Sequence, residues 1–219
     1  MQPPRLPSDS DHVAIAGRTG SGKTFGALAM LARQDLDKRP WFIIDHKGDD
    51  SIKSLDREEV SLSTRFLPDK GLFVIRPKYG ERKDRMALED FFVRVFKKRK
   101  AGIYVDEGHL VGPSPALRNI FVAGRSHKVT VMWCSQRAAQ IDPFIWSQAS
   151  FYRVFALQTA LDIKRFNENF PMKFEQLPEF HSYYYDVKRG KVHLLAPAPH
   201  LADTKSLLDA KLYTGYGRL

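Results

Sequence analysis

The segment Gly17–Thr24, which reads Gly-Arg-Thr-Gly-Ser-Gly-Lys-Thr, constrains this chain more than any other feature. It fits the pattern G-x-x-x-x-G-K-[ST] at every position, between an apolar run, His12–Ala16, and a helical stretch, Thr24–Arg33. Glycines let successive backbone N–H groups surround a phosphate without Cβ clashes, and the positive end of the following helix favours an anion. A glycine turn that binds nothing is the alternative, but the flanking strand and helix favour a phosphate-binding loop.

The loop also predicts individual roles. Lys23 is expected to reach the β- and γ-phosphates of a nucleotide, and the Thr24 hydroxyl is expected to hold Mg²⁺. The residues expected to contact the nucleotide are Gly17, Arg18, Thr19, Gly20, Ser21, Gly22, Lys23 and Thr24.

Short apolar runs alternate with amphipathic stretches along the chain, which is typical of an α/β domain with a mostly parallel central sheet flanked by helices. The clearest helix is expected over residues 84–98, where apolar residues from Leu88 to Phe96 recur at helical spacing. Ser114-Pro115 predicts another helix start, and a third helix is expected near residues 160–168. Strands are expected at His12–Ala16, Trp41–Asp45, Leu72–Ile75, Gly102–Asp106, Val129–Cys134 and Phe151–Leu157.

The two ends of the chain carry weaker patterns. Residues 1–10 predict an irregular arm, residues 182–195 predict a β-hairpin with Gly190 in the turn, and residues 196–219 show no convincing helical periodicity. We therefore expect one nucleotide-binding domain over residues 11–195, followed by a tail that either clamps a neighbouring subunit or is plain surface.

Composition excludes several classes of protein. The 219 residues carry a net charge of +10 and one cysteine, Cys134, so an internal disulfide is impossible and Cys134 is expected to be a small core residue. No uninterrupted apolar stretch is long enough to span a bilayer, and the first residues lack an apolar signal core. These features predict a cytoplasmic protein without an integral membrane segment, and the positive charge favours anionic partners such as nucleic acid.

Two adjacent carboxylates, Asp106 and Glu107, end one of the expected strands. An acid at the tip of such a strand can hold Mg²⁺ through water, so Asp106 is the second expected magnesium residue. A second carboxylate directly after it can orient and deprotonate an attacking water, which makes Glu107 the expected catalytic base. The pair favours nucleotide hydrolysis over phosphate transfer to another substrate, because a kinase must keep water from the γ-phosphate. An ordinary acidic loop is the alternative.

A polar triplet, Ser135-Gln136-Arg137, follows the expected strand at Val129–Cys134. Its amide, Gln136, can touch the γ-phosphate or the attacking water and so report hydrolysis to the rest of the fold. A solvated strand end is the alternative.

Arg125 lies at the end of the helix before this strand and can reach the γ-phosphate of a neighbouring subunit. A basic residue favoured by the helix dipole is the equally weighted alternative, and Arg153 is the second candidate for the same role. His109 and His127 are expected to be ordinary polar residues, since no His/Cys cluster has the spacing of a structural metal site.

Residues 76–100 contain ten Lys/Arg and four Asp/Glu, which is +6 of the total charge of +10. The helix dipole and solubility account for such a run, but it can also form a surface for the DNA backbone. No sequence-reading DNA motif is present, so binding should not depend on base sequence. The candidates for DNA contact are Arg76, Lys78, Arg82, Lys83, Arg85, Lys97, Lys98, Arg99 and Lys100.

Taken in order, these motifs resemble those of FtsK/HerA-type P-loop ATPases, and most of all the genome-packaging ATPases of tailless, membrane-containing (double-jelly-roll) viruses. The resemblance covers about residues 12–165 and adds a D-x-K-G-[DE] motif, matched by Asp45–Asp49, to the Walker A loop, the Walker B pair and the Gln136 sensor. Arg125 stands where related motors carry an arginine finger. The match fades after residue 165.

The resemblance implies a RecA-like P-loop NTPase (ASCE) core that hydrolyses ATP with Mg²⁺. It also implies a homo-oligomeric ring, usually a hexamer, with double-stranded DNA in its channel, acting in the host cytoplasm or at the packaging vertex of the virion with vertex or portal proteins. The alternatives are a small-molecule P-loop kinase, another FtsK/HerA-type motor for conjugation or filamentous-phage assembly, and a nucleotide switch that does not hydrolyse.

Overall fold

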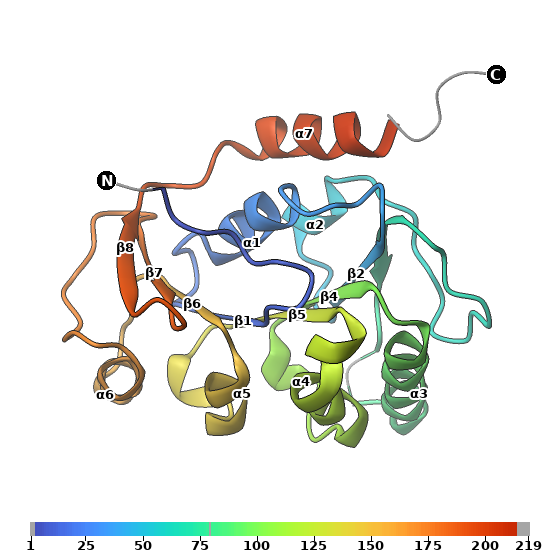
Figure 1. The fold of residues 1–219 in the computed structure, drawn as a ribbon, viewed down its shortest axis with the longest axis horizontal. Helices are drawn as coiled ribbons and strands as arrows, with labels where there is room; N and C mark the ends of the chain where they lie inside the picture. The colour runs from blue at the N-terminus through green and yellow to red at the C-terminus, as the bar shows by residue number, and fades with distance from the viewer. Residues whose placement is uncertain (1–2, 79, 214–219) are drawn as a thin grey trace.

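A computed structural model describes residues 3–78 and 80–213, and these residues form an eight-stranded sheet in the order β3-β2-β4-β5-β1-β6-β7-β8 (Figure 1). The strands from β3 to β6 in this order are parallel, and β7 and β8 extend the sheet as an antiparallel hairpin. The strands are β1 (Val13–Ala16), β2 (Pro40–Asp45), β3 (Gly71–Ile75), β4 (Ala101–Asp106), β5 (Val129–Ser135), β6 (Phe151–Val154), β7 (Ser182–Asp186) and β8 (Lys191–Leu195).

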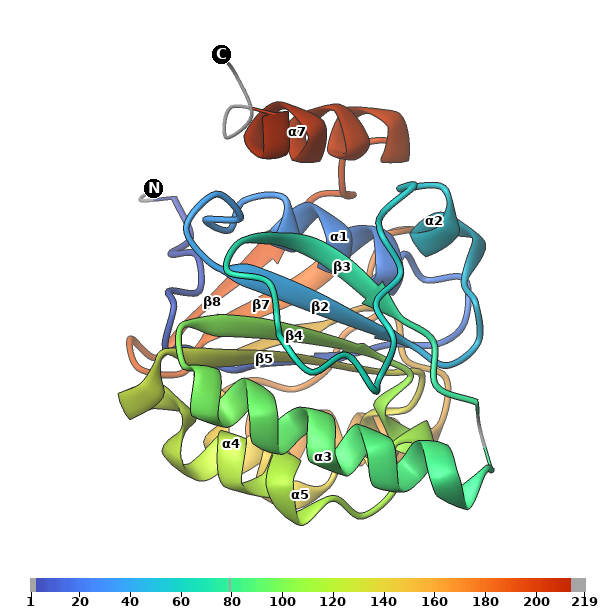
Figure 2. The ribbon, with the colours of Figure 1, turned by 90° about the vertical axis from the view of Figure 1, so that its right-hand side faces the viewer.

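Helices cover both faces of the sheet, with α1, α2 and α7 on one face and α3, α4, α5 and α6 on the other (Figures 1 and 2). The helices are α1 (Lys23–Leu31), α2 (Asp50–Lys53), α3 (Arg82–Lys98), α4 (Pro115–His127), α5 (Pro143–Gln148), α6 (Ala160–Asn169) and α7 (Leu201–Tyr213). In the part of the chain that the structure describes, none of these helices has the length and apolar character needed to cross a bilayer.

The parallel strands are buried on both sides, which is why they are almost continuous apolar runs in the sequence. Alternate side chains enter two separate cores. Phe42 contacts Phe91 of α3 on one face, while its neighbour Trp41 belongs to the core beneath α1. The expected α/β architecture with a mostly parallel sheet is therefore confirmed.

The strand order decides where the motifs meet. β5, the strand that precedes Gln136, lies between β1 and β4, so it separates the strand before Gly17–Thr24 from the strand that ends at Asp106. Ala16 pairs with Ser135 and Asp45 pairs with Asp106, which brings the ends of four strands to one side of the sheet. We call this side the carboxyl edge, and the side where the parallel strands begin the amino edge.

Most of the expected elements are present. The helix expected at residues 84–98 begins at Arg82, Ser114 caps α4 through the Leu117 N–H, and Gly190 lies in the hairpin turn with φ 63°. The strand expected to reach Leu157 ends at Val154 instead, because its neighbour β1 ends at Ala16 and no ladder partner continues.

Among residues 3–78 and 80–213, three helices were not expected, namely α2, α5 and α7, and α7 is the longest of them. It lies above α1 (Figure 1) and contributes one fully buried side chain, Leu208, to the core. Polar contacts also hold it, since Arg57 pairs with Asp209 and Lys205 donates to the Ser54 carbonyl. Leu201 and Leu212 pack against the same core, but Leu207 is exposed on another face of the helix. Apolar residues therefore do not mark a single face of α7, and the periodicity on which a sequence-based prediction depends is lost.

Candidate functional site

The loop Gly17–Thr24 joins β1 to α1 in a conformation suited to binding phosphate. Gly22 precedes the helix with φ 90°, a value that side chains other than glycine rarely adopt. The Arg18 N–H donates to the Ala156 carbonyl at 2.8 Å, which ties the loop to the end of β6. Lys23 is largely buried, and its ammonium donates to the Arg18 carbonyl at 3.0 Å, so it lies within the loop.

Glu107 follows β4 and points its carboxylate along the carboxyl edge. Its backbone is left-handed with φ 52°, a strained conformation for a residue with a side chain, and the residue is only 7% exposed. The next residue is Gly108, where a Cβ would lie 2.1 Å from the Trp133 ring. The chain can therefore make this sharp turn only with glycine after Glu107.

Gln136 connects Glu107 to the phosphate-binding loop. Its amide nitrogen donates to Glu107 Oε1 at 2.6 Å, and its amide oxygen accepts from the Thr19 hydroxyl at 3.1 Å. One side chain thus touches both the expected base and the loop that would hold the phosphates. The neighbouring Arg137 points elsewhere, because it pairs with Asp162 at 2.7 Å and donates to Thr159.

Lys47 also lies at this site, although the sequence did not predict a role for it. Its ammonium lies 3.4 Å from Glu107 Oε1. Asp45 shapes the loop that presents it, since the Asp45 carboxylate accepts from the N–H groups of Gly48 and Asp49 at 2.8 and 3.0 Å. The Asp45–Asp49 motif was the available signal, but only the pairing of β2 with β4 places Lys47 against the carboxylate.

His109 also approaches Glu107, although the sequence gave no reason to expect it. Its Nδ1 lies 3.5 Å from Glu107 Oε2, an oxygen that is buried and accepts no hydrogen bond from the described residues. His109 is therefore part of the surroundings of the catalytic candidate rather than an ordinary polar residue.

Asp106 is buried at the tip of β4, where the Tyr104 hydroxyl donates to its Oδ1 at 2.6 Å. Burial raises the pKa of Asp106 to about 6, and the negative charges of Glu107, Asp49 and Asp45 add to this effect. A cation that accepts oxygen ligands would relieve this concentration of negative charge. The donor set therefore fits Mg²⁺, and Thr24, in the first turn of α1, is the second residue expected to hold it.

The two arginines considered for a role in a neighbouring subunit differ sharply. Arg153 is only 4% exposed and donates to the Gly26 carbonyl at 2.8 Å and to Ser182 at 3.1 Å, so it cannot leave the interior to reach another chain. The prediction of Arg153 as the second candidate was wrong. Arg125 is exposed near the start of β5 and donates to the Gln148 carbonyl at 2.7 Å. Its place at the amino edge is remote from the phosphate-binding loop of its own chain.

The basic segment 76–100 does not form one surface. Arg76 pairs with Asp45 and Glu59 and so supports the Asp45 loop, Lys78 lies near Glu81, and Lys98 pairs with Asp69. The other candidates form two clusters at opposite ends of α3, which has 17 residues and is therefore about 25 Å long. The first cluster comprises Arg82, Lys83 and Arg85 at the carboxyl edge, and the second comprises Lys97, Arg99 and Lys100 at the amino edge.

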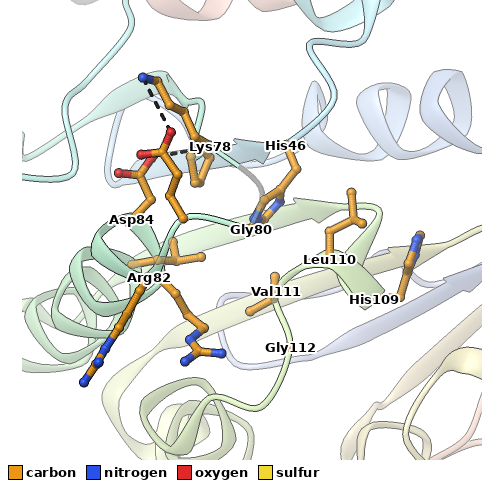
Figure 3. A pocket seen from close by; sticks show the side chains of 13 residues that line it. His46, Lys78, Gly80, Arg82, Asp84, His109, Leu110, Val111 and Gly112 are labelled. Atoms are coloured by element: carbon orange, nitrogen blue, oxygen red, sulfur yellow. Dashed lines mark hydrogen bonds and ion pairs between the residues drawn. The ribbon is translucent and has the colours of Figure 1, made fainter.

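The first cluster borders a cavity of about 270 Å³ at the carboxyl edge (Figure 3). Lys78, Arg82 and Arg85 line it from the β3–α3 side, and His109–Gly112 line it from the segment after β4. His46 also lines the cavity, and its buried Nδ1 has no hydrogen-bond partner among the described residues. The cavity therefore joins basic side chains to His109, which touches Glu107.

Comparison with known proteins gives a consistent picture. No protein-family model matches the chain. The DNA packaging ATPase P9 of Enterobacteria phage PRD1 is 29% identical over 208 residues, which cover 89% of this chain and 90% of that protein.

Solved structures share the fold at lower identity. The genome packaging NTPase B204 from Sulfolobus turreted icosahedral virus 2, in complex with ATP-gammaS, superposes with a TM-score of 0.70 at 18% identity and covers 87% of this chain and 99% of B204. EssC (ATPases 2 and 3) from Geobacillus thermodenitrificans gives a TM-score of 0.65 at 12% identity over 94% of this chain and 44% of that protein. The resemblance that the motifs indicated is confirmed, and so is the P-loop NTPase fold.

Proposed function

We propose that this chain is the ATPase of a viral genome-packaging motor, which hydrolyses ATP to move double-stranded DNA. The observation that carries the proposal is the position of Gln136, whose amide bonds both Glu107 and Thr19 of the phosphate-binding loop. The similarity to the packaging ATPase P9 over 89% of the chain supports the biological setting.

The chemistry follows from the placement of these side chains. Lys23 and the N–H groups of Gly17–Thr24 bind and orient the triphosphate, and they stabilise the charge on its γ-phosphate. Glu107 accepts a proton from the attacking water as the water oxygen bonds to the γ-phosphorus, and the bond to the β–γ bridging oxygen breaks. Gln136 positions both the water and Glu107, and the Lys47 ammonium, 3.4 Å from Glu107 Oε1, helps to orient the same carboxylate.

Mg²⁺ belongs to this site as the expected cofactor. When bound, it would neutralise negative charge on the β- and γ-phosphates, and Thr24 and Asp106 are the residues that would hold it.

Arg125 acts on a neighbouring subunit in this proposal. Its remote position in its own chain means that it can reach a γ-phosphate only if another subunit presents one. A homo-oligomeric ring, with a hexamer as the expected form, supplies that arrangement. We place the ring in the host cytoplasm and at the packaging vertex of the virion, where vertex or portal proteins are its expected partners.

DNA contact is assigned first to the cluster Arg82, Lys83 and Arg85. These cations have no ion pair within the residues that the structure describes, and Arg82 and Arg85 border the cavity that contains His109. Contact with backbone phosphates explains how the motor acts on any sequence. The second cluster at the far end of α3 also lies next to a helix C-terminus, where the dipole alone favours cations.

A steady-state ATPase assay with and without duplex DNA of unrelated sequences tests the proposal. We expect Mg²⁺-dependent release of phosphate that any duplex DNA stimulates. Phosphate transfer to a small acceptor without stimulation by DNA would identify a kinase, and nucleotide binding without turnover would identify a switch. Either result would overturn the proposal.

A further inference from the structure

A second hollow adjoins the phosphate-binding loop on the α1 side of the sheet. It has a volume of about 550 Å³, and Gly20 and Gly22–Thr24 form one wall. Apolar groups dominate the opposite wall, which comes from three separate parts of the chain: Phe25 of α1, Phe180 of the loop before β7, and Pro197–His200 between β8 and α7. We call this hollow the Phe180 pocket.

Phe180 has two unfavourable properties at once. Its backbone is left-handed with φ 59°, a conformation that is strained for a residue with a side chain, and the residue is 44% exposed although its side chain is apolar. The Phe180 ring lies close against the phosphate-binding loop, since a Cβ added to Gly22 would be 3.3 Å from it. A strained and exposed aromatic residue directly over a phosphate-binding loop points to a ligand that covers the ring.

The identity of that ligand follows from the geometry of a nucleotide. The loop binds the phosphates, so the sugar and the base must extend from Gly20–Thr24 into the adjoining space. The Phe180 pocket is that space, and its volume exceeds what a purine needs. Aromatic and apolar faces are the groups on which bases stack.

We propose that the Phe180 pocket binds the base of the nucleotide, which stacks on the Phe180 ring and is closed in by Phe25 and by Pro197–His200. The inference rests on the proposed function, since it places the nucleotide that the motor hydrolyses. It also gives the segment after residue 195 a role within its own subunit, because the pocket wall is the connection that leads into α7.

The anchoring of α7 makes this wall stable. Leu208 is fully buried against the core beneath the helix, Arg57 pairs with Asp209, and Lys211 donates to the Gln34 carbonyl at 2.8 Å. These contacts hold the segment just before α7 in place beside the loop. Lys23 and Thr24 are assigned to the phosphates and Mg²⁺, which leaves few pocket side chains able to hydrogen-bond a base, namely Asp49, Ser51 and His200. Stacking therefore dominates, and purine nucleotides should bind with similar affinity.

The test compares nucleotides with inorganic tripolyphosphate, which has the phosphates but no base. Phe180→Ala should weaken binding of ATP and of GTP about tenfold, because a stacked base contributes roughly 1–3 kcal/mol. The same variant should leave the affinity for tripolyphosphate unchanged. Phe180→Tyr should retain the affinity of the original chain, and Phe66→Ala, which removes another exposed ring, should have no effect on either ligand.

A fluorescent reporter gives an independent measurement. In Phe180→Trp, the new indole should be quenched by ATP and unaffected by tripolyphosphate. Equal loss of both ligands in Phe180→Ala would show that the ring only supports the loop, and unchanged ATP affinity would show that the base lies elsewhere. Each of these results overturns the inference. If the original chain hydrolyses ATP in the same experiments, the proposed function stands even when the pocket assignment fails.

Discussion

The two edges of the sheet use the same uncommon backbone conformation for different purposes. At the amino edge, Arg99 and Lys128 have positive φ values where α3 and α4 end, and their N–H groups donate to the last helical carbonyls. At the carboxyl edge, Glu107 and Phe180 have positive φ values where no helix ends. Strain at the amino edge therefore terminates helices, whereas strain at the carboxyl edge directs side chains toward a site.

The edges also differ in their buried charges. Buried side-chain atoms that have no hydrogen-bond partner among the described residues occur at both edges, for example Glu107 Oε2 at the carboxyl edge and His12 Nε2 at the amino edge. At the carboxyl edge, however, Asp106 lies among other carboxylates, and their negative charges add to burial in raising its pKa. A buried charge of this kind costs stability unless a cation or another ligand compensates it. The carboxyl edge therefore trades stability for function, and the following experiments test that difference.

The largest effect is expected from Glu107→Gln. Removing the proposed base should lower the rate of ATP hydrolysis about 1000-fold, because a positioned base contributes 10²–10⁴-fold, while ATP binding persists. Phosphate release and equilibrium nucleotide binding measure the two quantities. Glu168→Gln, an exposed change on α6, is the matched control and should keep full turnover. Full activity of Glu107→Gln would remove Glu107 from the mechanism.

Arg125→Ala tests the one amino-edge residue to which a catalytic role is assigned. We expect turnover to fall about 100-fold, as when a single group that stabilises transition-state charge is removed. Mixing Arg125→Ala subunits with Lys23→Ala subunits should restore part of the activity. At some interfaces, the Arg125 of a Lys23→Ala subunit then faces the intact loop of an Arg125→Ala subunit. Absence of recovery at every mixing ratio would contradict action between subunits.

Asp106→Asn should stabilise the protein in the absence of Mg²⁺ and nucleotide. Burial raises the pKa of Asp106 to about 6, above the unfolded value of 3.8, so the native state binds the extra proton and loses stability as the pH rises from about 4 to about 6. Removing the charge should raise the free energy of unfolding at pH 8 by about 3 kcal/mol and abolish this pH dependence. Urea unfolding at several pH values measures it.

Asp162→Asn is the matched control, because Asp162 is also a buried aspartate. Burial opposes its ionisation, but hydrogen bonds from Thr159, the Ala139 N–H and Arg137 outweigh that effect and lower its pKa. Its contribution to stability is present above the unfolded pKa and is lost as the pH falls. Asp162→Asn should therefore lower the free energy of unfolding at pH 8. If Asp106→Asn and Asp162→Asn changed this free energy in the same direction, the proposed difference between the two aspartates would be contradicted.

The smallest effect is expected from charge reversal at the two ends of α3. Arg82→Glu with Arg85→Glu should weaken duplex DNA binding about tenfold. The slope of log K against log salt should become shallower by about 2, because two phosphate contacts are lost. Lys97→Glu with Lys100→Glu changes the net charge equally at the amino edge and should have a smaller effect. Equal losses in both variants would show that net charge, rather than the carboxyl-edge cluster, attracts the DNA.

The local motifs could be predicted from the sequence because neighbouring residues carry them. Gly17–Thr24 needs only its own glycines and the helix that follows, and Asp106-Glu107 needs only the buried strand before it. The helix α3 was equally accessible, since its apolar face repeats within one segment. In each case the physical signal lies within about twenty residues.

The tertiary structure alone decided which distant residues act together. The insertion of β5 between β1 and β4 places Gln136 between Thr19 and Glu107, and strand pairing brings Lys47 to the same carboxylate. The fold also buried Arg153 and separated the basic segment 76–100 into two ends of one helix. A sequence gives the chemistry of each side chain, but distances between remote segments depend on how the sheet is assembled.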